Sequence, residues 1–239
     1  MKYFHFLRLL SCSTRMRVSR SKHAPCSPAS NAVHLAGSSL RFGLLLAFFL
    51  FAFSSSAAQD DLNTYRETYK QEFLTDPRSP LKEDDLQYLD FFPEMPKAKV
   101  TATFFKTPAE QPFEMPTYSG VTRTYRKYGV AYFTWGKFNA SIALYENMTN
   151  ISNPLYKDYL FLPFNDSTNG ETTYGGGRYI NMSKADAEDG EIIIDFNKCY
   201  NPWCAYSDGF NCPIPPLENK LPFAVEAGER MYKGEHKKK

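Results

Sequence analysis

Short hydrophobic runs, rich in β-branched and aromatic residues, fill most of the chain after residue 97. Glycine, proline, asparagine and aspartate separate these runs, whose starts are mostly about 10 to 20 residues apart. Such runs are typical of an antiparallel barrel or sandwich. We therefore predict a mainly β fold of about eight strands, at Ala98–Phe105, Val121–Lys127, Val130–Trp135, Ser141–Tyr145, Tyr159–Phe164, Gly177–Met182, Glu191–Phe196 and Phe223–Glu226.

A helical period precedes the first of these runs. Apolar side chains recur at spacings of three and four residues, at Leu62, Tyr65, Tyr69 and Phe73. This pattern predicts an amphipathic helix. Asp60 or Asp61 can cap its beginning, and the Asp76-Pro77 pair ends it.

A second, shorter helix is predicted after the first. Ser79 is a residue type that caps helices, and Pro80 suits the first helical position. This helix runs through Leu86 and Leu89 and ends at Phe92-Pro93. One or two short helices are thus expected before the strands.

The longest apolar run, Phe42–Phe53, has the length of a signal-peptide core. Its twelve residues are fewer than the about 20 that span a bilayer. Basic residues precede it, and a run of Ser and Ala follows it. We expect residues 1–58 to be a leader cleaved near Ala58, and the mature chain to be periplasmic or secreted, without a transmembrane helix. Two alternatives remain open: an uncleaved membrane anchor at residues 42–58, and a two-part targeting sequence.

Charge divides the chain into two unlike parts. Residues 1–58 hold seven of the 28 basic residues and none of the 26 acidic ones. Residues 59–239 therefore hold 21 basic and 26 acidic residues, a net charge of −5. A net negative domain argues against nucleic acid as a partner, because nucleic acids bind to basic surface patches.

Histidine is missing from the predicted domain, residues 59–232. Three of the four histidines lie in the leader, and the fourth, His236, lies in a basic tail, 233–239, that we expect to be disordered. This distribution excludes Ser-His-Asp and Cys-His catalysis and sites that bind a metal through histidine. The phosphate-loop pattern Gly-x4-Gly-Lys-Ser/Thr does not occur either. We expect no metal and no cofactor.

Polar, glycine and proline residues concentrate between residues 163 and 219 in four motifs. They are Phe164-x-Asp166-x-Thr168-x-Gly170, Thr173-Tyr174-Gly175-x-Gly177-Arg178-Tyr179, Asp195-Phe196-Asn197-x-x-Tyr200-Asn201-Pro202-x-Cys204-Ala205-Tyr206 and Cys212-Pro213-x-Pro215-Pro216-x-Glu218-Asn219. These motifs resemble those of the bacterial and archaeal family called domain of unknown function 1684. Weaker similarity extends the resemblance over residues 62–229. The resemblance implies no activity, because the family is named for lacking one.

The end of the run Glu191–Phe196 is the best candidate for a site. Alternation places Asp195 and Asn197 on the face opposite Ile192 and Ile194, at the mouth of the predicted barrel. These residues either bind a ligand or belong to a polar network that braces a loop. The predicted ligand-binding residues are Tyr174, Arg178, Asp195, Asn197, Tyr200, Asn201, Trp203 and Glu218.

Two polar features in this region have a structural and a functional interpretation. Arg178 either holds a ligand carboxylate or, as we favour, pairs with Asp195. The glycines Gly175–Gly177 form a turn that enters a strand, or let the backbone approach an anion. The oxygen-rich stretch around Asp166 is interpreted as a turn rather than a calcium loop, since it lacks the regular spacing of an EF-hand.

Three cysteines follow the leader. Cys204 and Cys212 enclose a seven-residue loop, and a disulfide is the expected state in an oxidising compartment. A reactive or metal-binding thiolate is the alternative. The third residue, Cys199, leaves an odd count and hence a free or intermolecular thiol.

Five Asn-x-Ser/Thr sequons lie after the leader. They are possible glycosylation sites of a secreted glycoprotein, or a consequence of an Asn/Thr-rich composition in a bacterium. The asparagines are Asn139, Asn147, Asn150, Asn165 and Asn181.

Two functional hypotheses follow from these residues. The first is an exported, non-catalytic β domain that binds a small polar or sugar-like ligand, or a partner. The second is a carboxylate-dependent, glycosidase-like hydrolase that uses Asp195 and Glu218, with a thiol enzyme that uses Cys204 as a weaker variant.

Overall fold

The computed structural model describes residues 61–149, 151–154, 156–187 and 190–238, and the statements below refer to these residues. All of them belong to the second of two compact units, Ala58–Lys239. The predicted leader, residues 1–58, lies outside the described residues.

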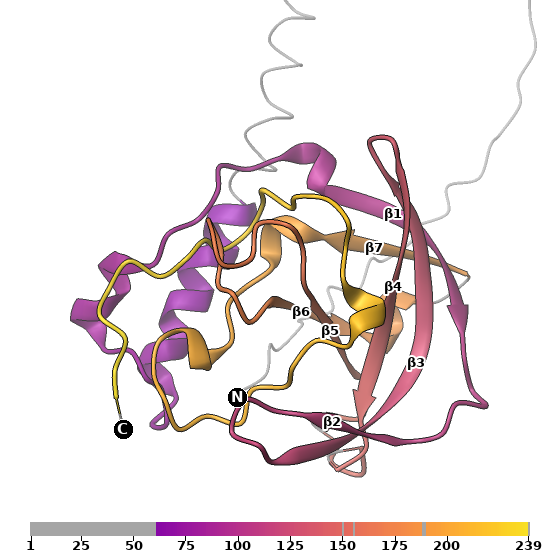
Figure 1. The fold of residues 1–239 in the computed structure, drawn as a ribbon, viewed down its shortest axis with the longest axis horizontal. Helices are drawn as coiled ribbons and strands as arrows, with labels where there is room; N and C mark the ends of the chain where they lie inside the picture. Colours follow the sequence, from indigo (N-terminus) through magenta and orange to yellow (C-terminus); the bar gives the residue numbers. More distant parts are fainter. Residues whose placement is uncertain (1–60, 150, 155, 188–189, 239) are drawn as a thin grey trace, which may run out of the picture. The chain divides into compact units, whose positions relative to one another are not determined.

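Seven antiparallel strands form one curled sheet, half of a barrel (Figure 1). Their order across the sheet is β6-β5-β4-β3-β1-β7, and β2 pairs with β3 beside this path. The predicted mainly β, antiparallel fold is therefore confirmed. The strands are β1 (Lys99–Lys106), β2 (Phe113–Pro116), β3 (Thr122–Trp135), β4 (Phe138–Asn147), β5 (Tyr159–Phe164), β6 (Arg178–Ser183) and β7 (Glu191–Asp195).

The long strand β3 joins two strands that the sequence predicted separately. It pairs with β4 from Tyr125 to Trp135, and its register shifts between Lys127 and Gly129. A Cβ atom at Gly129 would lie only 2.6 Å from the carbonyl oxygen of Phe105, so this position accepts glycine alone. Gly129, which falls between the two predicted strands, therefore lies inside β3 at the point where its backbone passes close to β1.

The predicted strand at Phe223–Glu226 is wrong. Its side chains alternate between buried and exposed, as in a strand, but its backbone has no neighbouring strand in the described part of the chain. The Val225 amide donates to the Asp166 carboxylate (3.2 Å), and the Val225 carbonyl accepts from Arg178 (2.7 Å). Buried side chains thus replace the strand partner. Strand β2, which the sequence analysis missed, follows Pro112 and ends at Pro116.

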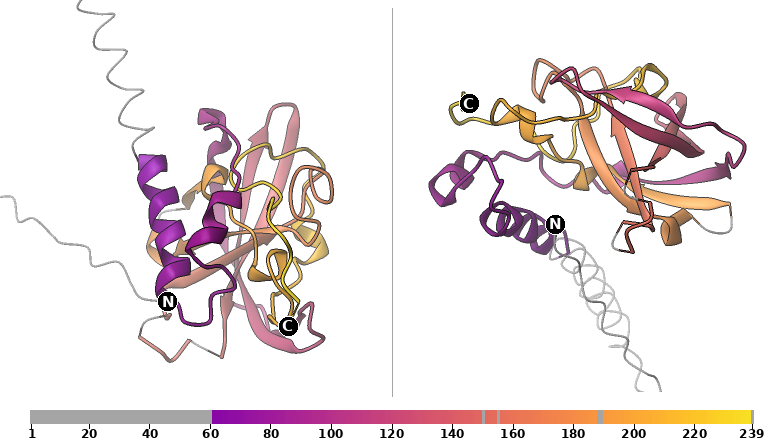
Figure 2. Two further views of the ribbon diagram at one scale, coloured as in Figure 1. Left: turned by 90° about the vertical axis from the view of Figure 1, so that its left-hand side faces the viewer. Right: turned by 90° about the horizontal axis from the view of Figure 1, so that it is seen from below.

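A helix covers residues 61–75, as predicted, and lies to one side of the sheet (Figure 2). The second predicted helix is wrong in type and extent, because the chain forms only the 3-10 helix η1, Glu83–Tyr88. Ser79 does not cap it, since its hydroxyl bonds to the amide and carbonyl of Leu81. The remaining 3-10 helices are η2 (Pro96–Ala98), η3 (Lys184–Ala187), η4 (Phe196–Lys198), η5 (Trp203–Ala205) and η6 (Leu217–Asn219).

Each face of the sheet covers a hydrophobic cluster. The larger cluster takes the inward side chains of β1, β3, β4 and β7, among them Phe104, Leu144 and Ile194. The other face carries an aromatic cluster with Tyr145, Phe161 and Tyr179. Helix 61–75 packs through a third cluster, which joins its Tyr69 and Phe73 to Leu81 and Tyr206.

The C-terminal tail is ordered over residues 233–238, which corrects the expectation of disorder. Lys237 forms a parallel bridge with Ser207, and its amide donates to the Tyr206 carbonyl (2.9 Å). Its ammonium group bonds to Asp85 and to the carbonyl of Pro80. The basic composition of the tail therefore serves ion pairs with the domain.

Asn219 completes the sheet where β4 and β5 separate. These strands share a single register pair, Tyr145 with Phe161. The fully buried Asn219 amide accepts from the Ala143 amide (2.7 Å) and donates to the carbonyls of Ala143 (2.8 Å) and Pro163 (2.7 Å). One side chain thus satisfies backbone groups of two strands.

We expect Asn219→Ala to destabilise the domain strongly. The substitution leaves three buried backbone groups without these partners, and each such group costs about 1–3 kcal/mol. The free energy of unfolding, measured by urea denaturation, should fall by about 3 kcal/mol. The matched control is Asn139→Ala on the exposed start of β4, for which a change below about 0.5 kcal/mol is expected. Equal losses in the two variants would contradict the role given to Asn219.

Candidate functional site

The first two motifs meet in a buried ion pair. Arg178 Nη2 lies 2.8 Å from Asp166 Oδ2, and both side chains are completely inaccessible to solvent. The other Asp166 oxygen accepts from the amide and hydroxyl of Thr168 and from the Val225 amide. The predicted pair of Arg178 with Asp195 is therefore wrong. The stretch around Asp166 is a turn, as interpreted from the sequence.

Arg178 also fastens the C-terminal segment to β6. Its guanidinium donates to the carbonyls of Val225 (2.7 Å), Ala227 (2.6 Å) and Glu229 (3.2 Å). The turn before it needs glycine at Gly177, where φ is +88° and a Cβ atom would lie 2.6 Å from the Phe164 carbonyl oxygen. The structural interpretation of the three glycines accounts for this geometry.

Glu229 is the centre of a second buried polar group. Its carboxylate accepts from the hydroxyls of Tyr69 (2.9 Å) and Tyr206 (2.6 Å) and from the Asn201 amide (2.8 Å). Burial raises the pKa of Glu229 from its ordinary 4.5 to about 7. Asn201 is fully buried and donates to the Arg230 carbonyl. Two predicted site residues, Arg178 and Asn201, thus lie inside the domain.

Asp195 and Asn197 hold a neighbouring segment of backbone. The Asn197 amide group accepts from the Met95 amide and donates to the Met95 carbonyl, both at 2.9 Å. Asp195 in turn accepts from the backbone and side-chain nitrogens of Asn197, both at 3.0 Å. These two predicted site residues therefore position the segment Phe92–Lys97.

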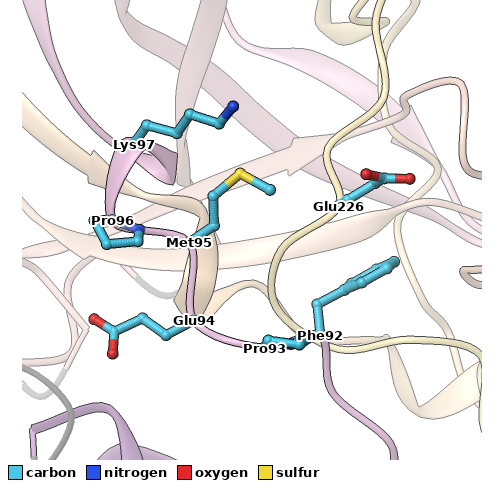
Figure 3. Close-up of a pocket in the computed structure, with 7 residues that line it drawn as sticks. All are labelled: Phe92, Pro93, Glu94, Met95, Pro96, Lys97 and Glu226. Carbon is cyan, nitrogen blue, oxygen red and sulfur yellow. The ribbon is translucent and has the colours of Figure 1, made fainter.

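This segment and Glu226 line an open depression of about 520 Å³ (Figure 3). Most of its lining is apolar, from Phe92, Pro93, Met95 and Pro96. In Figure 3 the Met95 side chain extends toward the side of Glu226, whereas Glu94 extends the opposite way. The remaining lining residues are Glu94, Lys97 and Glu226. We call this site the 92–97 depression.

Sequence reasoning did not identify the lining residues of the 92–97 depression. Among these residues the sequence analysis used only Phe92 and Pro93, to end the second predicted helix. The wall is also held from helix 61–75, because Arg66 Nη2 donates to the Phe92 carbonyl (2.7 Å). The Phe92 amide donates to the Gly228 carbonyl (2.9 Å).

Two other predicted residues, Tyr174 and Tyr200, lie next to β6: Tyr174 comes four residues before its start, and Tyr200 forms a backbone bridge with Tyr179. The Tyr174 ring lies 6.5 Å from that of Tyr118, and the Tyr200 ring lies 6.0 Å from that of Tyr179. Both Tyr159 and Tyr200 donate to the side-chain oxygen of Asn181. We call these residues, Tyr118, Tyr159, Tyr174, Tyr179, Tyr200 and Asn181, the tyrosine cluster.

Trp203 lies directly before the disulfide loop, in the 3-10 helix η5. Its half-buried ring packs edge-on against Phe210 (5.2 Å), and the Arg78 guanidinium lies over it at 5.7 Å. The predicted site residues therefore occupy different places in the domain instead of one mouth.

Asp195 and Glu218 do not come together. Asp195 pairs with Lys99 at the start of β1. Glu218 forms an ion pair with Lys127 of β3. Lys127 comes two residues before Gly129, which pairs with Lys106 at the other end of β1. Lys99 and Lys106 are the first and last residues of this eight-residue strand, so they are separated by about 23 Å. A glycosidase pair needs carboxylates about 5–10 Å apart, so these two residues cannot act on one bond.

Cys204 and Cys212 form a disulfide, with their Cα atoms 6.3 Å apart. Cys204 is therefore no free nucleophile. Cys199 is buried, and burial raises its pKa to about 11, which keeps the thiol protonated at neutral pH. From the sequence we expected His236 to lie in a disordered tail, away from the domain. In the structure its Nε2 atom lies 3.3 Å from the Cys204 carbonyl oxygen and 3.8 Å from the Asp208 carboxylate, so one imidazole contacts the domain.

The sequons differ in exposure. Asn139 and Asn181 are exposed, whereas Asn147 and Asn165 are half-buried. Asn150 lies outside the described residues. Accessibility thus favours Asn139 and Asn181 as acceptors, if any of the sequons is used.

The described residues contain neither a metal-binding group of side chains nor a helix that could span a membrane. His, Cys, Asp and Glu side chains nowhere form a group of three that could hold a metal ion within residues 61–238, gaps aside. None of the helices in that part of the chain has the length and hydrophobicity needed to cross a bilayer.

The redox state of the cysteines has a direct test. A protein of residues 59–239, denatured without reductant, should show one reactive thiol, that of Cys199. The native protein should show none, since Cys199 is buried. The measurement is a thiol count on protein purified from its own compartment, with peptide mapping of the 204–212 link. Three thiols would contradict the disulfide.

Comparison with known proteins gives a family and solved structures of similar fold. The chain is 31% identical to an uncharacterised protein of Haloarcula marismortui whose solution structure is known. The similarity covers 74% of this chain and 96% of that one, with a TM-score of 0.58. The comparison with curated proteins found no match. A family model matches residues 84–230, and the chain therefore belongs to the family described as protein of unknown function (DUF1684).

Proposed function

We propose that the domain is a non-catalytic binding domain and that its ligand occupies the 92–97 depression. The observation that carries this proposal is the double hydrogen bond between Asn197 and the Met95 backbone. It shows that motif residues hold the wall of a concave site in place. A wall fixed before the ligand arrives lowers the entropic cost of binding.

The size and lining of the depression indicate the ligand class. A volume of about 520 Å³ lies within the range of small-molecule sites. The apolar lining favours a ligand with an apolar body, and the charged side chains of Glu94, Lys97 and Glu226 favour a polar group on it. This ligand is less polar than the sugar-like molecule that the sequence suggested.

A sugar-like ligand has a second candidate surface in the tyrosine cluster. The hydroxyl of Tyr118 is held by the Gly176 carbonyl (3.0 Å), and those of Tyr159 and Tyr200 are held by Asn181. Rings fixed in this way can stack on sugar faces without losing rotamer freedom. Tyr118 is 45% exposed, whereas the other four rings of the cluster are half-buried or buried.

Catalysis has little support among the residues that the sequence suggested. Asp195 and Glu218 are far apart, Cys204 is bonded to Cys212, and Cys199 is buried. An exported location, periplasmic or secreted, is part of the proposal. The disulfide supports it, because such bonds persist mainly in oxidising compartments.

A ligand-observed NMR screen with a library of small molecules tests the site. Binders should lose their saturation-transfer signal in Met95→Trp, where the larger side chain fills the depression. Leu74→Trp on helix 61–75 is the matched control, since it adds the same side chain to an exposed position and should leave binding unchanged.

Two outcomes would contradict the assignment of the ligand to the 92–97 depression. Binders that survive Met95→Trp but are lost in Tyr118→Ala would place the ligand on the tyrosine cluster. For that variant Tyr132→Ala is the control, because Tyr132 is 50% exposed on the same face of the sheet. Binders that survive both Met95→Trp and Tyr118→Ala would contradict a ligand site at either place.

A further inference from the structure

Glu229 joins helix 61–75 to the rest of the domain. Tyr69 comes from the helix, whereas Tyr206 and Asn201 come from the segment that follows β7. The Tyr69 and Tyr206 hydroxyls also lie 3.0 Å from each other. Beyond these polar contacts, Phe73 packs edge-on against Tyr206 at 5.5 Å. The buried carboxylate is thus part of the docking surface of the helix.

All three groups that donate to the Glu229 carboxylate are neutral. In the described part of the chain no cation forms an ion pair with it. Arg178, on β6, is engaged by Asp166 at 2.8 Å, and Arg230, the next residue, by Asp90 at 3.0 Å. The other titratable groups around it are Tyr65 and Tyr69 of the helix, and Cys199 and Tyr206 of the segment after β7, whose pKa values are all raised by burial.

We propose that Glu229 is a pH-sensitive latch, which holds helix 61–75 tightly when protonated and loosens it as the pH rises through neutrality. When the helix leaves, water reaches the carboxylate and hydrates its charged form. When the helix is docked, that charge must stay buried with neutral partners. Opening therefore releases a proton and becomes more favourable at higher pH.

The sign and size of the effect follow from linkage. The docked carboxyl has a pKa of about 7, and a water-exposed one has the ordinary value of 4.5. Because the docked state binds the proton more strongly, docking weakens as the pH rises above 4.5 and levels off above 7. Between pH 5.5 and 8.5 the opening equilibrium should rise about 30-fold.

Loosening the helix also affects the 92–97 depression. Arg66 of the helix donates to the Phe92 carbonyl and lies over the Phe91 ring at 4.8 Å. Phe91 in turn forms a backbone bridge with Glu229. The latch does not rest on the proposed ligand site, and its test needs no ligand.

Hydrogen exchange measured by mass spectrometry tests the latch. Protection of amides in residues 61–75 is compared at pH 5.5 and 8.5, corrected for the intrinsic rate, with the amides of β4 as internal reference. Helix protection should fall about 30-fold relative to β4 in the natural protein. In Glu229→Gln, which keeps the side-chain shape but cannot ionise, it should stay constant. A fall of equal size in Glu229→Gln, or no fall in the natural protein, would overturn the proposal.

A second variant keeps the test decisive if Glu229→Gln does not fold. Tyr69→Phe removes one donor from the charged carboxylate and leaves the aromatic packing of the helix. The docked carboxyl should then bind its proton still more strongly, and helix protection should fall by more than 30-fold over the same pH range. An unchanged or smaller fall in Tyr69→Phe would overturn the proposal on its own.

Discussion

The buried ion pair between Asp166 and Arg178 is the interaction on which the rest of the domain depends. Taking two charges out of water is costly, and hydrogen bonds to the remaining donors and acceptors offset the cost. Here those bonds come from the backbone of Thr168 and of the segment Val225–Glu229, and they leave Arg178 Nε without a partner among the described residues. The ion pair therefore determines where the C-terminal segment crosses the sheet, and with it the position of Glu229.

This arrangement separates the structural residues of the family motifs from those near a possible ligand. The most polar motif residues, Asp166, Arg178 and Asn201, are buried and bonded within the domain. Asn197 hydrogen-bonds to the backbone of Met95, and Asp195 in turn hydrogen-bonds to Asn197. A motif rich in charged and polar residues thus builds the scaffold, and the surface that it supports is lined by apolar residues that no motif contains.

Local pattern was enough to predict most of the strands and the first helix, because both depend on periodicity within a few residues. It failed where a long-range partner decides the structure. Phe223–Glu226 has the alternation of a strand, yet Asp166 and Arg178 occupy its backbone. The tail is as basic as a disordered segment, yet Asp85 binds Lys237. Arg178 has several carboxylates within reach in sequence, and only the fold selects Asp166. The disulfide was predictable because its two cysteines are close in sequence.

The most direct test of this account is the free energy of unfolding of Arg178→Lys. Lysine keeps the charge but cannot reach Asp166 and three carbonyls at once. The account predicts a loss of about 3–5 kcal/mol in urea denaturation, as for a broken buried pair. Arg78→Lys, in the exposed pair with Asp76, is the control and should lose less than about 1 kcal/mol. If Arg178→Lys lost no more than Arg78→Lys, the buried ion pair would not be the interaction that organises the domain.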